Sequence, residues 1–118
     1  MSARARLFSA VVLLAACKPG RMQERDRLEQ SVSWLATVQM LSHAWAENRV
    51  PTAYTERTLD EARAQLANAK QDGAAALVAR VRDLVRQRDR AAIRNTIADL
   101  DGPRRALELR AATMKRSP

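Results

Sequence analysis

The sequence predicts an all-α protein: a small antiparallel, up-and-down helical bundle of about four helices. Apolar residues recur every three or four positions over most of the chain, which is the spacing of one buried helix face. Hydrophobic residues make up 47% of the 118 residues but aromatic residues only 3%, so Ala, Val and Leu must supply most of the core. The few glycines and prolines lie at the ends of the periodic stretches, where helices stop and start.

The first sixteen residues have the layout of a secretory signal peptide that is cleaved off. Arg4 and Arg6 precede an apolar segment, residues 7–14, which is followed by small residues. The uncharged run over residues 7–17 is 11 residues long. A hydrocarbon core of about 30 Å needs about 20 helical residues, so this run is too short to span it. We therefore divide the chain into a signal peptide (1–16), a tether (17–21) and a helical bundle domain (22–118).

The signal peptide ends in Leu14-Ala15-Ala16-Cys17, which resembles the lipobox of bacterial lipoprotein precursors. The resemblance covers about the first seventeen residues. It implies cleavage between Ala16 and Cys17, and a covalent diacylglyceryl group and N-acyl chain on Cys17. Several acyl chains, at about 0.8 kcal/mol per buried CH₂, anchor a protein permanently where one chain does not. Lys18 stands where Asp resembles an inner-membrane retention signal in Gram-negative lipoproteins, so we expect the periplasmic face of the outer membrane.

Two helices are predicted in the first half of the domain. The first covers residues 22–49 and is ended by Pro51, which disfavours helix at the residue before it. The second covers residues 52–71, with Thr52 as N-cap and Gly73 as the stop. The expected core positions of these two helices are Leu28, Val32, Leu35, Val38, Leu41, Trp45, Leu59, Ala62, Leu66 and Ala69.

A third helix is predicted to begin near residue 74 and to break near Asp89. Continuing its apolar stripe by four residues from Val85 places Asp89 on the core face, so we expect Asp89 to cap a fourth helix instead. Asp101-Gly102-Pro103 is expected to end that helix, with a last short helix over residues 104–114. The expected core positions are Leu77, Val81, Leu84, Val85, Ile93, Ile97, Leu100, Leu107 and Leu109.

Two aromatic side chains and a set of arginines are the candidate binding residues. Trp34 and Trp45 are eleven residues apart, or three helical turns, and so share a face. They are ligand-pocket or interface residues, or simply large core side chains, with Tyr54 expected to close the same end of the bundle. Arginines spaced by four form a ridge for an anionic partner if the helix is continuous, or a solvated face if it breaks: Arg82, Arg86, Arg90 and Arg94.

The sequence points to binding rather than catalysis. His43 is the only histidine, the only cysteine is expected to be lipidated, and no phosphate-binding loop or metal-ligand motif occurs, so we expect no enzyme, no metal and no cofactor. The net charge of +8 does not indicate nucleic acid, because secretion places the chain in another compartment. We expect a lipid-anchored adaptor module for an envelope protein. The alternatives are a carrier of a small apolar ligand near Trp34 and Trp45, and an envelope enzyme with acidic catalysts.

Overall fold

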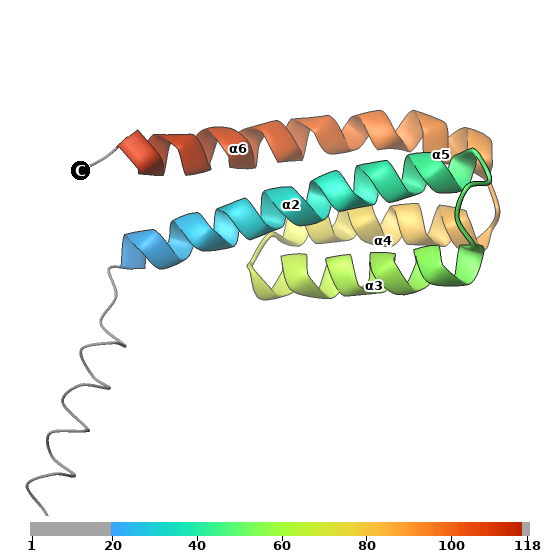
Figure 1. The fold of residues 1–118 in the computed structure, drawn as a ribbon, viewed down its shortest axis with the longest axis horizontal. Coiled ribbons are helices and arrows are strands. Elements are labelled where there is room, and N and C mark those ends of the chain that lie inside the picture. The colour runs from blue at the N-terminus through green and yellow to red at the C-terminus, as the bar shows by residue number, and fades with distance from the viewer. Residues whose placement is uncertain (1–19, 117–118) are drawn as a thin grey trace, which may run out of the picture.

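The axis of the domain is the long helix α2 (Gly20–Ala46), which lies between α6 and the α3–α4 hairpin (Figure 1). The computed structural model describes residues 20–116. Helix α2 begins two residues before the predicted start, inside the predicted tether, and ends three residues earlier than predicted. Its predicted apolar stripe is buried as expected, except that Val32 is half-buried at the edge of the core. Ser31 and Ser42 are buried beside this stripe.

Helices α3 (Thr52–Asn68) and α4 (Asp72–Arg86) form an antiparallel hairpin that packs along one side of α2. Leu59, Ala62 and Leu66 of α3 are fully buried, as predicted. Pro51, rather than Thr52, occupies the N-cap position of α3, and it makes no side-chain cap bond. Thr52 is the first helical residue instead, so that its hydroxyl is available to Trp45 of α2.

The predicted break at Asp89 is confirmed. Helix α5 (Arg90–Ile97) follows it, and the Asp89 carboxylate accepts a hydrogen bond from the Ala92 backbone N–H at 3.0 Å. This side-chain bond satisfies one of the amide groups that a helix start leaves without an intrahelical partner. Val85, the last predicted core residue of α4, is fully buried, and Ile93 continues the core on α5. The two helices therefore share one core without sharing one axis.

The predicted break at Asp101-Gly102-Pro103 is wrong. Helix α5 passes through the 3₁₀ turn η1 (Ala98–Leu100) directly into α6 (Asp101–Arg116), so the last helix begins three residues earlier than predicted. Pro103 lies in the first turn of α6, where a missing N–H is tolerated. The backbone N–H that proline lacks would have bonded to the carbonyl of Asp99, and the chain tightens to 3₁₀ geometry at that point.

Three helices end in the same way, on a residue with left-handed backbone that is not glycine. Asn48, Lys70 and Arg88 have φ of 62°, 61° and 57°, and each lies two residues after its helix. The next residue then donates its N–H to a carbonyl five residues back, at 2.8 Å, 2.8 Å and 3.0 Å respectively. This is the hydrogen bonding of a Schellman motif. Gly73 was predicted to stop α3, but it lies inside α4.

These elements make an all-α, antiparallel up-and-down bundle, as the sequence predicts. The core runs along α2 and is shared by α3, α4, α5 and the inner face of α6. Leu107 and Ala111 of α6 belong to it, whereas Leu109, predicted to be core, is 70% exposed. Helix α6 packs mainly on α2. Among the helices of residues 20–116, none is long and apolar enough to cross a membrane.

Candidate functional site

Trp45 is a core residue whose polar atom and ring face are both occupied. Its side chain is buried at the end of α2, and its indole N–H donates to Thr52 Oγ1 at 3.0 Å. The Arg90 guanidinium carbon lies 4.7 Å from the centroid of the indole ring, within range of a cation–π interaction. The indole therefore ties the end of α2 to the first residues of α3 and α5.

The three aromatic candidates do not form one site. Trp34 is half-buried and borders a shallow depression whose other lining residues also belong to α2. These neighbours are all polar or charged: Asp26, Glu29, Gln30 and Ser33. Tyr54 is 54% exposed on the first turn of α3, so the expectation that it closes the bundle is wrong. At that end the core contains Trp45 and Ala46, and Val50 packs against it.

The arginine ridge is divided by the break between α4 and α5. Two of its members lie on α4 and two on α5, on helices with different axes: Arg82, Arg86, Arg90 and Arg94. A single ridge spaced by four residues requires one continuous helix. The arrangement on which the anionic-partner hypothesis depended is therefore absent from this part of the structure.

Most of these arginines bind groups of the protein itself. Arg82 forms an ion pair with Asp60 and so links α4 to α3. Arg94 donates from Nη2 to the Ala46 carbonyl oxygen at 3.3 Å, where α2 ends and its last carbonyls lack helical partners. Arg86 is exposed in the last turn of α4, where positive charge is favoured by the helix dipole. Three of the four arginines, including Arg90 over Trp45, thus support the packing of the bundle.

A polar cluster that the sequence analysis did not identify joins α2 to the start of α6. The Gln39 side-chain amide donates to Asp101 Oδ1 at 2.8 Å and to the Ile97 carbonyl oxygen at 3.3 Å. Arg104 Nη2 lies 3.3 Å from the same carboxylate. The pKa of Asp101 lies below its usual range, mainly because Gln39 donates a hydrogen bond to its carboxylate and, second in size, because Arg104 does so too. The only sequence signal for this cluster is a glutamine at the edge of an apolar stripe.

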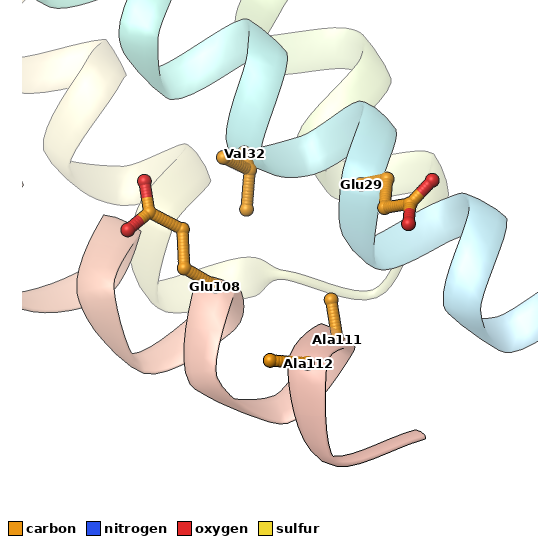
Figure 2. A pocket seen from close by; sticks show the side chains of 5 residues that line it. All are labelled: Glu29, Val32, Glu108, Ala111 and Ala112. Atoms are coloured by element: carbon orange, nitrogen blue, oxygen red, sulfur yellow. The ribbon is translucent and has the colours of Figure 1, made fainter. Parts of the chain in front are cut away.

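A depression of about 260 Å³ lies between α2 and α6 (Figure 2). Val32 and Ala111 point toward one another across it, and the carboxylates of Glu29 and Glu108 lie on its two sides. Glu108 is engaged by Arg104, whose Nη1 lies 3.1 Å from it. Glu29 is paired as well, since its Oε1 lies 4.0 Å from Arg25 Nε, so both carboxylates of this open site face arginines of their own helices.

His43 is the remaining titratable residue that the sequence analysis singles out. His43 Nε2 is 3.0 Å from Glu47 Oε1, one helical turn away on the exposed side of α2. Among residues 20–116, no group of three histidine, aspartate or glutamate side chains is placed to hold a metal ion. Ala16 and Cys17, the predicted cleavage and lipid-attachment residues, lie outside the described residues. Comparison of the chain with protein-family models, curated proteins and solved structures finds no match.

Proposed function

We propose that this protein is an envelope lipoprotein whose lipid, attached to Cys17, holds a helical adaptor module at the membrane. The observation that carries the proposal is the N-terminal pattern: two arginines, an uncharged apolar run, and Leu14-Ala15-Ala16-Cys17. Helix α2 begins at Gly20, three residues after that cysteine, so an anchored Cys17 places the domain directly at the membrane surface. The lysine that follows Cys17 favours the periplasmic face of the outer membrane.

The adaptor role is supported by the position of α6. This helix packs mainly on α2, on the side away from the α3–α4 hairpin (Figure 1). Its inner residues Leu107 and Ala111 are buried, and on its outer side Leu109 is 70% exposed beside the exposed Ala106. Partners that receive a helix in a groove bind apolar anchors at helical spacing, and Ala106 and Leu109 are three residues apart on α6. The geometry at Trp34 and Trp45 offers no comparable support for the carrier hypothesis.

Two measurements test the two halves of the proposal. Mass spectrometry of the protein from its native membrane fraction is expected to show cleavage before Cys17 and acyl mass on it, both lost in Cys17→Ser. A photo-crosslinking residue at position 109 is expected to capture one dominant envelope protein. The same residue at Ala64, exposed on α3, serves as the control and is expected to capture none. Equal capture at both positions, or an unmodified Cys17, contradicts the corresponding half.

A further inference from the structure

A groove of about 450 Å³ opens at the end of the bundle where α2 begins. Three segments that are far apart in the sequence form it: the first turns of α2, the turn between α3 and α4, and the C-terminal half of α6. Figure 1 shows the blue start of α2 and the red end of α6 at the same end of the domain. Among the lining residues, Leu28 is buried and supplies an apolar floor, and Arg27, Lys70 and Arg110 supply positive charge.

The positive charge of this groove is only partly compensated. One carboxylate lines it, that of Glu24, and its Oε1 lies 3.7 Å from Arg110 Nη2. Arg27 and Lys70 have no carboxylate partner among residues 20–116. Gly20, the first residue of α2, also lines the groove. The groove therefore combines an apolar floor with two cations that have no carboxylate partner in the described part of the chain.

The position of the groove along the chain indicates where its ligand comes from. Gly20 is three residues after Cys17, and a fully extended chain covers at most about 3.6 Å per residue, or about 11 Å for these three steps. A lipid on Cys17 therefore brings the mouth of the groove to the headgroup layer. Phosphate groups are the anions of that layer, and basic side chains near an anionic surface are attracted to it.

We propose that this groove binds the anionic phosphate headgroup of phospholipids in the membrane that holds the anchor. The proposal rests on the lipid anchor proposed above. It fixes an orientation: α2 points away from the membrane, and the opposite end of the bundle, with the turn between α4 and α5, faces the aqueous space. The headgroup contact and the lipid anchor then both attach the same end of the bundle to the membrane.

The test compares two variants of the full-length chain that lose the same charge at opposite ends. The groove variant is Arg27→Gln with Lys70→Gln. The control is Arg57→Gln with Arg88→Gln; these residues are exposed near the start of α3 and just after α4. Lys70 and Arg88 have the same left-handed backbone, so the two changes perturb folding alike. They flank α4, whose 15 residues span about 22 Å, more than the Debye length of about 10 Å.

The readout is flotation with vesicles of phosphatidylcholine, with and without phosphatidylglycerol. The apolar N-terminal segment contributes to binding of both kinds of vesicle. The ratio of the partition coefficient with phosphatidylglycerol to that without it therefore isolates the effect of charge. Each basic side chain at an anionic surface contributes about five-fold, so the groove variant is expected to lose about 25-fold in this ratio. The control pair is expected to lose no more than about two-fold. Equal losses in both variants, or no loss in the groove variant, overturn the proposal.

A soluble arm separates the membrane from a free phosphate ester. Glycerol 3-phosphate at the same phosphate concentration is expected to leave flotation unchanged. If it releases the protein from anionic vesicles through Arg27 and Lys70, the groove is a site for soluble phosphate esters, and the membrane proposal fails. Acyl mass on Cys17 is measured separately. A groove-dependent ratio without acyl mass overturns the anchor alone, and acyl mass with equal losses in both variants overturns the groove alone.

Discussion

The indole of Trp45 connects three helices, and replacing it by phenyl measures how much that connection contributes. Trp45→Phe removes the hydrogen bond to Thr52, which is worth about 1 kcal/mol. It leaves a cavity of about 40 Å³, which costs about 1 kcal/mol at about 24 cal/mol per Å³. It also weakens the cation–π contact with Arg90 by about 0.5 kcal/mol. We expect a loss of about 2.5 kcal/mol in the free energy of unfolding.

Urea unfolding followed by far-UV circular dichroism checks this value, since a slope of about 2 kcal/mol per M converts it to a midpoint about 1 M lower. Thr52→Val isolates the hydrogen bond and is expected to cost about 1 kcal/mol. A double-mutant cycle of Trp45→Phe with Arg90→Met is expected to give a coupling of about 0.5 kcal/mol. A loss below about 0.5 kcal/mol for Trp45→Phe refutes the reasoning, because it means that the contacts of the indole contribute nothing in solution.

Three further changes test other features of the bundle. Arg88→Gly relieves left-handed backbone at a non-glycine residue, so it is expected to raise the free energy of unfolding by about 0.5–1 kcal/mol in urea unfolding; a loss contradicts the strain argument. The lowered pKa of Asp101 stabilises the fold above the ordinary aspartate pKa of about 3.9, and this stability is lost as the pH falls through the folded value. In Asp101→Asn, the free energy of unfolding should therefore depend less on pH below about pH 4 than in the wild type; identical pH curves for the two proteins refute this. Ser42 has a buried hydroxyl without a hydrogen-bond partner among residues 20–116, so Ser42→Ala is expected to leave stability unchanged or to raise it by up to about 1 kcal/mol; a thermal melt showing a clear loss reveals a hidden partner.

The sequence predicts the helices of this fold because their burial follows a regular spacing. Leu35, Val38 and Leu59 are fully buried at predicted positions, and Asp89 caps α5 as predicted, since a carboxylate on a core face is costly. The prediction for Leu109 was wrong at the level of spacing itself. Leu109 follows Leu107 by two residues, about 200° around a helix, so the two side chains cannot share one buried face, and α6 packs mainly on α2.

The errors at helix ends have one physical cause: the chemistry of single residues depends on their place in the turn. Pro103 and Gly73 are both typical of helix breaks, yet each lies within the first turn of a helix, where neither disrupts hydrogen bonding. Conversely, Lys70 and Arg88 take the left-handed position that usually signals glycine. The candidate site was predicted less well than the fold, because the groove near Gly20 depends on contacts between distant segments that no local pattern records.

The placement of both ends of the described chain also determines how the domain responds to force. Gly20 and Arg116 lie at the same end of the bundle, on the neighbouring antiparallel helices α2 and α6 (Figure 1). Pulling these two points apart loads the contacts between α2 and α6 one after another, as in opening a zipper, rather than all together in shear. The pair is therefore mechanically soft from this end, and the α3–α4 hairpin, which lies between α2 and α6 along the chain, is loaded only after these contacts have opened.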